Sequence, residues 1–219
     1  MASEPTPNPK TNTLPIQAPA ALDRAVELLQ RGDLVAFPTD TVYGLGAHAF
    51  LEEAVLHLFQ VKDRPANVPI PLLLPDVEAM TMVCTDIPPL AWQLAGRFWP
   101  GGLSLVLRRS ALVPDAVTAG QPTVAVRVPD HPAVRDLCRR LGAPVATTSA
   151  NRHGQPSPVT AAGVEAGLAG RIALILDGGP CQSGMASTVL DLTVSPPAIL
   201  RPGPVTAKHL ADLVPLRSD

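Results

Sequence analysis

The sequence has little of several features that commonly define a class of protein. Its three cysteines are widely spaced among 219 residues and form no CxxC pair, which argues against a disulfide framework and a zinc site. A formal charge of -2 provides no general attraction for nucleic acid, so any polyanion contact must be local. No apolar run reaches the roughly 18–20 residues of a membrane span. We therefore expect a soluble cytoplasmic protein with reduced thiols.

Motifs for common nucleotide sites and hydrolases are missing as well. Neither GxxxxGK[ST] nor GxGxxG occurs, which argues against P-loop and Rossmann nucleotide binding. The absence of HExxH and GxSxG similarly argues against zincin and serine-hydrolase activity.

Hydrophobic residues make up 46% of the chain, which is enough for a substantial core. Residues 1–18 are polar, rich in proline and without apolar periodicity, so we expect a flexible N-terminal arm. One domain should then occupy residues 19–219, beginning near Pro19.

Strand and helix patterns alternate along this domain. Helical periodicity is present at Leu22–Leu29, at Leu51–Phe59 and most clearly at Pro132–Leu141, where Gly142 ends the pattern. Apolar runs predict strands at 34–37, 70–74, 103–107, 124–128, 145–147, 172–176 and 189–192. Alternating strands and helices predict an α/β sheet covered by helices on at least one side.

Lys62 and Arg64 follow the second of these helices. Two cations at this position can simply complement the negative end of the helix dipole. Alternatively, an ammonium and a planar guanidinium together can bind triphosphate oxygens, with the arginine bidentate. The two residues alone do not decide between these interpretations.

Thr147-Thr148-Ser149-Ala150-Asn151 follows a short predicted strand. The segment has the composition of a hydroxyl-rich turn that caps a helix. Its hydroxyl, amide and backbone N–H groups could equally hold phosphate or carboxylate oxygens, with Ser157 close enough in sequence to contribute.

Arg127 and Arg201 each end an apolar run. An arginine in such a position is usually a solvated charge, but it can also bind a carboxylate. Ser187 and Thr188 are by themselves compatible with ordinary hydroxyls at a strand edge.

Taken in order, PTDTVYGLG, KDRP, FWPGGLSLVL, VAVRVPDHP, TTSANRHGQPSP, STVLDL and ILRPGP resemble the motif string of the YrdC/Sua5 family, the threonylcarbamoyl-AMP synthases. The resemblance runs from about Leu34 to Pro204. It implies a twisted, mostly parallel open α/β sheet with flanking helices, enclosing one concave, positively lined site.

The resemblance also implies an activity and its substrates. L-Threonine, bicarbonate or CO2 and ATP would condense to threonylcarbamoyl-AMP and pyrophosphate, with Mg2+ accompanying ATP and no organic cofactor. The product would pass to a tRNA threonylcarbamoyltransferase complex for the t6A37 modification of tRNAs that read ANN codons. A weak RNA or tRNA contact is compatible with this activity.

The resemblance assigns two groups of binding residues. No protein ligand to the metal and no general base are implied, and Lys62 and Arg64 would stabilise charge during the reaction. The ATP group is Lys62, Arg64, Thr123, Ser149, Asn151, Ser157 and Arg201. The threonine group is Thr41, Tyr43, Arg127, Thr147 and Ser187.

Two positions depart from the family pattern, because Val68 and Leu73 replace an asparagine and a histidine found in many relatives. Two other functions also remain open. The chain could be an RNA-binding or ribosome-associated module, or a carbamoyltransferase that uses carbamoyl-adenylate. Missing zinc-finger cysteines argue against the carbamoyltransferase, which carries additional domains in its known forms.

Overall fold

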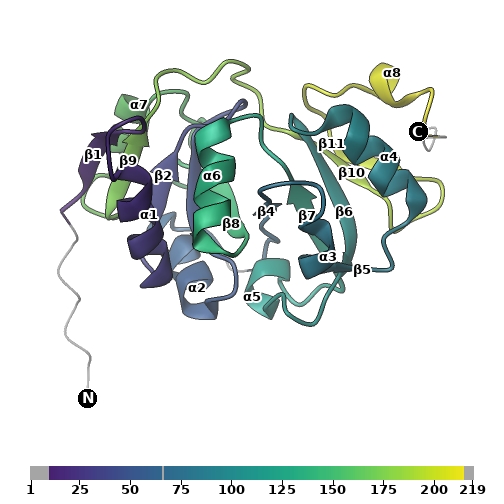
Figure 1. The fold of residues 1–219 in the computed structure, drawn as a ribbon, viewed down its shortest axis with the longest axis horizontal. Coiled ribbons are helices and arrows are strands. Elements are labelled where there is room, and N and C mark those ends of the chain that lie inside the picture. Colours follow the sequence, from purple (N-terminus) through teal and green to yellow (C-terminus); the bar gives the residue numbers. More distant parts are fainter. Residues whose placement is uncertain (1–9, 66, 215–219) are drawn as a thin grey trace.

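One open sheet of eleven strands organises residues 10–65 and 67–214, the part of the chain that the computed structural model describes (Figure 1). The strands are β1 (Asn12–Pro15), β2 (Val35–Phe37), β3 (Gly44–His48), β4 (Leu72–Leu73), β5 (Cys84–Thr85), β6 (Leu103–Arg109), β7 (Thr123–Arg127), β8 (Val145–Ser149), β9 (Leu174–Asp177), β10 (Thr188–Asp191) and β11 (Ala198–Arg201). The helices are α1 (Ala21–Gln30), α2 (Glu52–Val61), α3 (Met80–Val83), α4 (Pro89–Phe98), α5 (Asp115–Thr118), α6 (Pro132–Leu141), α7 (Ala161–Leu168) and α8 (Ala207–Leu210). Within these residues, no helix combines the length and apolarity needed to cross a bilayer.

The strand order is β1-β9-β2-β3-β8-β4-β7-β6-β10-β11, with β5 paired to β6. The expected open α/β sheet with flanking helices is confirmed, but the expectation of a mostly parallel sheet is wrong. In the described part of the chain, four strand pairings are parallel and six are antiparallel. One reason is β3, which lies between β2 and β8 and is antiparallel to both. Its Gly44 and Gly46 weaken the strand signal in the sequence.

Side chains on the two faces of the sheet enter separate cores. Leu73 and Val145 pack with α1 and α6, whereas Leu72 and Ala146 pack on the side that includes α2, α4 and α5. Successive strand residues point to opposite faces, so strands buried on both sides appear as continuous apolar runs. This explains why their positions could be predicted from hydrophobicity alone.

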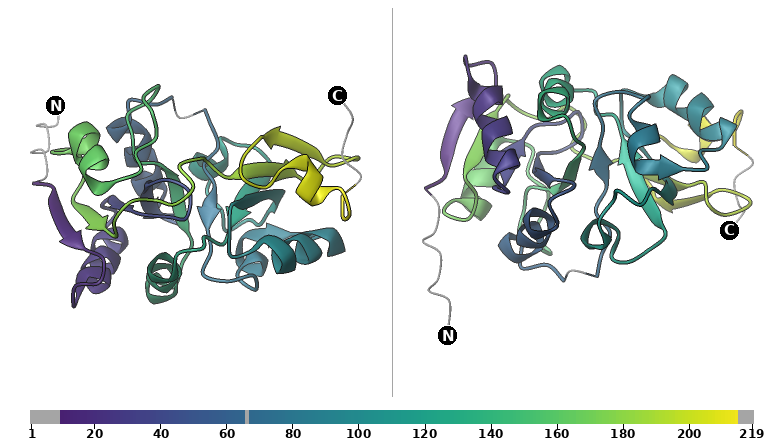
Figure 2. Two further views of the ribbon diagram at one scale, coloured as in Figure 1. Left: turned by 90° about the horizontal axis from the view of Figure 1, so that it is seen from above. Right: turned by 60° about the horizontal axis from the view of Figure 1, so that its bottom comes forward.

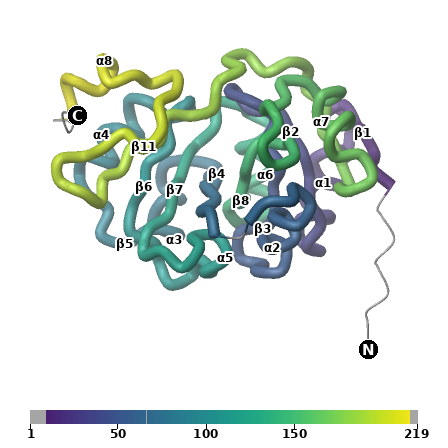
Figure 3. Tube along the Cα trace, turned by 180° about the vertical axis from the view of Figure 1, so that it is seen from behind, coloured from purple at the N-terminus to yellow at the C-terminus, as the bar shows by residue number. Residues whose placement is uncertain are grey.

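The N-terminal segment corrects one domain boundary. Asn12–Pro15 forms β1 and pairs in parallel with β9, placing it at the edge opposite β11 (Figures 2 and 3). The flexible arm predicted for residues 1–18 therefore does not extend to residue 18, and the ordered fold begins before Pro19. Residues 1–9 lie outside the described part. Pro15 is tolerated at the last position of an edge strand, where its missing N–H does not interrupt a central ladder.

Gly46 of β3 allows Phe37 of β2 and Val145 of β8 to pack across the strand. A Cβ atom at Gly46 would lie 2.6 Å from Phe37 Cε1 and 2.6 Å from Val145 Cγ1. Close packing in a buried sheet leaves such an atom no space without movement of its neighbours. Packing of the central sheet therefore requires glycine at position 46.

We predict that Gly46→Ala lowers the free energy of unfolding by about 1–3 kcal/mol because the added methyl overpacks this contact. Denaturant titration provides the measurement. Gly96→Ala in α4 is the matched control, since a Cβ there meets no atom within 4 Å and alanine favours a helix over glycine. Equal stability of Gly46→Ala and the wild type would contradict the prediction.

Candidate functional site

A cavity of about 240 Å³ lies where the sheet extends past α6. Its polar lining consists of eight hydroxyl residues and three arginines: Thr39, Thr41, Ser104, Thr147, Thr148, Ser149, Ser157, Ser187, Arg64, Arg127 and Arg201. Aspartate and glutamate do not occur among its described lining residues. Such a cavity suits a small anionic ligand with several oxygen atoms.

The strand register brings the floor of the cavity together. Leu73 of β4 lies directly beside Arg127 of β7, and both line the cavity. Thr147 and Ser149 of β8 alternate with buried Ala146, so they share the face that carries Leu73. The cavity floor is therefore part of the sheet surface, and α6 covers the neighbouring part of that surface.

The end of α2 explains the direction of its two cations. Asp63 N donates to Gln60 O at 3.1 Å and Arg64 N donates to Phe59 O at 3.0 Å, which is the hydrogen-bond pattern of a Schellman motif. Asp63 occupies the left-handed position with φ 53°. The resulting reversal turns Lys62 and Arg64 toward the loop that follows β8.

Lys62 is buried and bonded to that loop rather than exposed in the cavity. Its ammonium donates to the carbonyl oxygens of Ser149 and Asn151, while its own carbonyl accepts from His153 N at 2.8 Å. Burial and, secondarily, the neighbouring Arg64 charge lower the pKa of Lys62 to about 8. Lys62 does not line the cavity, so the structure gives it a role in holding the loop.

Arg64 is the cation from this turn that faces the cavity. Its Nη1 atom donates to Thr148 Oγ1 at 3.0 Å, and its guanidinium carbon lies 5.8 Å from the centroid of the Phe59 ring. The ring supports the guanidinium through a cation–π contact. Burial lowers the pKa of Arg64, which nevertheless stays charged at physiological pH.

Asn151 closes the loop with its side chain. Its Nδ2 atom donates to Arg152 O at 2.8 Å and to Gln155 O at 2.6 Å. Because both partners are carbonyl oxygens, both amide hydrogens are occupied. The Oδ1 atom is buried without a partner in the described part of the chain. Asn151 does not line the cavity, and it has no free amide hydrogen for a phosphate.

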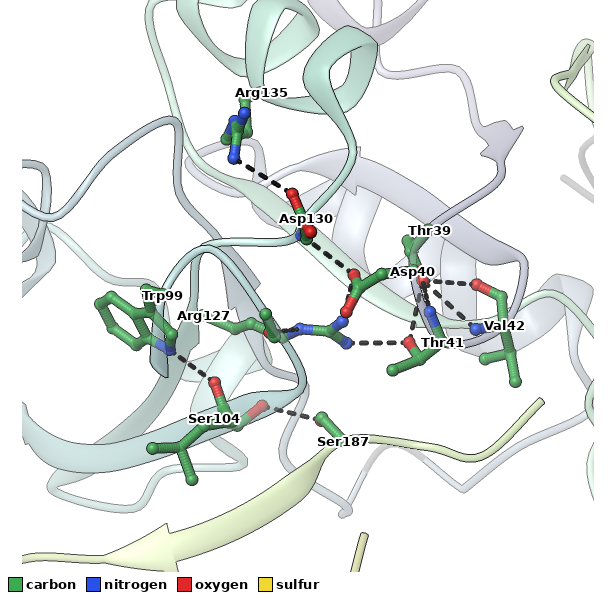
Figure 4. Close-up of polar contacts among 12 residues, drawn as sticks. Thr39, Asp40, Thr41, Val42, Trp99, Ser104, Arg127, Asp130, Arg135 and Ser187 are labelled. Carbon is green, nitrogen blue, oxygen red and sulfur yellow. Dashed lines mark hydrogen bonds and ion pairs between the residues drawn. The ribbon is translucent and has the colours of Figure 1, made fainter. Parts of the chain in front are cut away.

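Arg127 is held on three sides (Figure 4). Nε donates to Gly101 O at 2.8 Å, Nη1 to Thr41 Oγ1 at 3.0 Å and Nη2 to Asp40 Oδ1 at 2.5 Å. Burial lowers the pKa of Arg127, and the Asp40 carboxylate opposes this effect. Asp130 N also donates to Asp40 Oδ1, at 3.1 Å, which fixes the carboxylate. Within residues 10–65 and 67–214, two of the five N–H groups of the guanidinium remain for a ligand.

Ser187 connects two other lining residues. Its Oγ atom lies 2.9 Å from Ser104 Oγ (Figure 4) and accepts from Arg201 Nη2 at 3.0 Å. Arg201 Nε also donates to the carbonyl oxygen of Ser187 at 3.0 Å. Ser187 and Arg201, which the family resemblance assigned to different substrates, therefore meet at one point of the cavity wall.

Two predicted residues lie away from the cavity. Tyr43 is completely buried and its hydroxyl donates to Gly179 O at 2.9 Å, so the expectation that it lines the pocket is corrected. Burial raises its pKa to about 12. Thr123 begins β7, four residues from Arg127 at the other end of the strand, and it does not line the cavity. Four residues of strand span about 13 Å.

The residue assignments made from the sequence left out Asp40 and three cavity residues, Thr39, Ser104 and Thr148, although Thr148 belongs to the hydroxyl-rich segment named as a candidate. Asp40 follows a buried apolar strand and stands between two threonines, a position where a charge calls for a partner. Ser104 is a polar residue within an apolar run, so its hydroxyl also calls for a partner. Of the two positions that depart from the family pattern, Leu73 lines the cavity as an apolar wall, whereas Val68 is 37% exposed.

Fold and cavity together define an α/β protein with a cavity on one face of its sheet that suits small anionic ligands. The family model Sua5_yciO_yrdC, described as telomere recombination, matches residues 27–203. The chain belongs to this family.

Several relatives carry the name threonylcarbamoyl-AMP synthase. The protein from Pyrococcus abyssi is 44% identical over 190 residues, which cover 87% of this chain and 56% of the relative. A putative threonylcarbamoyl-AMP synthase from Mycobacterium tuberculosis is 37% identical over 200 residues, covering 91% of this chain and 92% of the relative. This chain thus spans little more than half the length of the Pyrococcus relative and most of the mycobacterial one.

The fold agrees with a solved structure of the same family. P. abyssi Sua5 complexed with L-threonine superposes with a TM-score of 0.89 and 39% sequence identity, covering 94% of this chain and 62% of that one.

We predict that Lys62→Met speeds hydrogen exchange in the loop of residues 149–153, because two carbonyl oxygens lose their charged donor. Such a hydrogen bond contributes about 1.5–3 kcal/mol, so a roughly tenfold or greater increase is expected. Hydrogen–deuterium exchange mass spectrometry on the apo protein measures this rate. Lys208→Met, at an exposed position in α8, serves as the control. Unchanged exchange in this loop would rule out the holding role of Lys62.

Proposed function

We propose that this chain is an L-threonylcarbamoyladenylate synthase, which condenses L-threonine, bicarbonate or CO2 and ATP. The observation that carries the proposal is a single cavity that joins Arg127 and Thr41 to Arg64 and Ser149. An amino acid held by its carboxylate at one arginine and ATP held by its phosphates at another can meet in this cavity, so that the amine end of the amino acid reacts next to the phosphates. The names of the relatives support the choice of amino acid and nucleotide.

The amino acid is proposed to bind beside Arg127. Its two uncommitted N–H groups can receive the carboxylate, while Asp40 and Gly101 keep the guanidinium in place. Hydroxyls of Thr41 and Ser187 can contact the amine and the side chain. The Oγ1 hydrogen of Thr147 is directed to Val145 O at 3.0 Å, so Thr147 offers only an acceptor.

The phosphates of ATP are proposed to bind on the side of Arg64, Ser149 and Ser157. Within the described residues, no protein hydrogen bond occupies the side-chain hydroxyls of these two serines, which leaves them for phosphate oxygens. A cavity of about 240 Å³ is smaller than the roughly 300–1,000 Å³ of sites that enclose a drug-sized ligand, so the nucleoside would extend beyond it.

Mg2+ fits this site as the ion of the ATP complex. No carboxylate lines the described cavity, whereas Mg2+ commonly keeps its waters and binds the phosphates of a substrate. Ser149 and Ser157 would then contact the complex through their hydroxyls. When bound, the ion neutralises phosphate charge.

The chemistry needs alignment and charge stabilisation more than a protein nucleophile. The amine nitrogen of threonine forms a bond to the carbon of CO2 and loses a proton, giving a carbamate. A carbamate oxygen then bonds to the α-phosphorus of ATP, and the bond from that phosphorus to the β-phosphate oxygen breaks to release pyrophosphate. Arg64 stabilises the charge that develops on the phosphates.

The product is proposed to serve the t6A37 modification of tRNA in the cytoplasm through a tRNA threonylcarbamoyltransferase complex. A stand-alone RNA-binding module is the second candidate, because two arginines lie at the surface near the loop that follows β8. Arg152 is exposed there and Arg171 is partly exposed. Both arginines, however, bond to Asp63, at 2.6 and 3.2 Å, which reduces the positive charge available to RNA.

The enzymatic function is tested by pyrophosphate release. We expect release only with L-threonine, bicarbonate and ATP together. Arg127→Met should raise the KM for threonine at least tenfold, and Arg64→Met should raise the KM for ATP similarly, because each loses a charged contact of about 1.5–3 kcal/mol. Arg24→Met is the control, as Arg24 pairs with Glu27 on the surface. Salt-sensitive RNA binding without pyrophosphate release would favour the second candidate.

We further predict that kcat/KM for ATP falls as the pH rises through about 8. The pKa of Lys62 is lowered to about 8, so its charged form is present below this pH and is lost above it. Lys62→Arg keeps its charge, and its profile should stay flat to higher pH relative to the wild type. Comparing the two proteins cancels the pH dependence of bicarbonate and of the threonine amine. Parallel profiles would contradict an electrostatic role for Lys62.

A further inference from the structure

Thr39 is a buried threonine at the cavity that the motif assignments leave without a role. Its Oγ1 atom lies 2.7 Å from Val42 O and 2.9 Å from Thr41 Oγ1 (Figure 4). A carbonyl oxygen only accepts, so the single hydroxyl hydrogen of Thr39 belongs to the bond with Val42. The hydrogen between the two threonines then comes from Thr41, whose hydroxyl shares the Thr39 oxygen with two backbone donors, Thr41 N at 3.1 Å and Val42 N at 3.3 Å.

The same count of hydrogens and lone pairs determines the direction of the Thr41 hydroxyl. Thr41 Oγ1 donates its only hydrogen to Thr39 and accepts one from Arg127 Nη1 at 3.0 Å. A hydroxyl has one donor hydrogen and two acceptor lone pairs, so one lone pair remains. Thr41 therefore presents only an acceptor to the cavity.

We infer that Thr39 is a positioning residue that makes Thr41 the acceptor for an N–H group of the substrate amine. The inference rests on the proposed function and adds a residue to its amino-acid site. A chain of hydrogen bonds running from Arg127 through Thr41 and Thr39 to Val42 O sets this polarity, and each member is buried or lines the cavity.

The polarity separates the two ends of the amino acid. Arg127 beside Thr41 donates hydrogen bonds and attracts the carboxylate, whereas the remaining lone pair of Thr41 repels carboxylate oxygens and accepts from nitrogen. An acceptor that holds an N–H also leaves the nitrogen lone pair unused. That lone pair is the one that must bond to CO2.

Equilibrium binding of L-threonine to the apo protein, measured by calorimetry, tests the inference. Thr39→Val should weaken threonine binding about tenfold, the loss expected for one misdirected hydrogen bond, with the KM for ATP changed less than twofold. Thr39→Ser, which keeps the hydroxyl, should bind within twofold of the wild type. Thr81→Val is the matched control, because Thr81 Oγ1 also donates to a nearby carbonyl, Glu78 O, at an exposed and distant site.

The Thr41→Val variant separates this role from a structural one. Thr39 Oγ1 also accepts from Thr41 N and Val42 N at 3.1 and 3.3 Å, so its loss could loosen the turn. If Thr39 acts through the Thr41 hydroxyl, Thr41→Val alone weakens threonine binding as strongly, and adding Thr39→Val causes no further loss. Additive losses, or an unaffected Thr41→Val, would overturn the inference. Should Thr39→Val not fold, Thr41→Val and Thr39→Ser still decide it.

Failure of the proposed function would look different. In that case the wild type itself does not bind L-threonine in the calorimeter. Binding by the wild type with equal affinity in Thr39→Val refutes the inference alone.

Discussion

Burial of Arg127 is the constraint on which the cavity depends. A guanidinium that is only 6% exposed must have its charge and its N–H groups matched, because an unpaired buried charge is very unfavourable. Asp40, Thr41 and Gly101 meet this demand from two loops that are far apart in the sequence. The requirement thus fixes the position of the turn after β2 relative to the end of β7, and it leaves two directed donors at the centre of the site.

The second fixed element is the contact between the end of α2 and the loop after β8. Lys62 bonds to two carbonyls of this loop, Arg64 bonds to Thr148, and Asp63 pairs with Arg152. Cations at a helix C-terminus are favoured in any case. Here they additionally set the distance between two segments that line the cavity. A lysine expected to bind phosphate directly thereby gains a role in shaping the cavity wall that is proposed to bind it.

Much of the fold could be predicted because local patterns specify it. Helix α6 spans Pro132–Leu141 as expected, since its apolar spacing is regular and Gly142 adopts φ 68° at its end. Strands β1 and β3 escaped prediction because Pro15, Gly44 and Gly46 obscure the usual strand signal. Pairing directions escaped it as well, since they depend on which strands meet across the sheet. A mixed sheet and a mostly parallel one can have similar apolar runs.

By itself, the sequence determined the family, the α/β class and most of the polar residues that line the cavity. Motif order and apolar periodicity are local properties, and both can be read directly from the chain. Only the tertiary structure decided which of these side chains face a ligand. Lys62 and Asn151 turn to backbone carbonyls, Tyr43 is buried, and the Thr41 hydroxyl has a fixed direction. The reason is physical: a buried polar group must satisfy its hydrogen bonds first, and the partners of Lys62 and Tyr43 lie far away in the sequence.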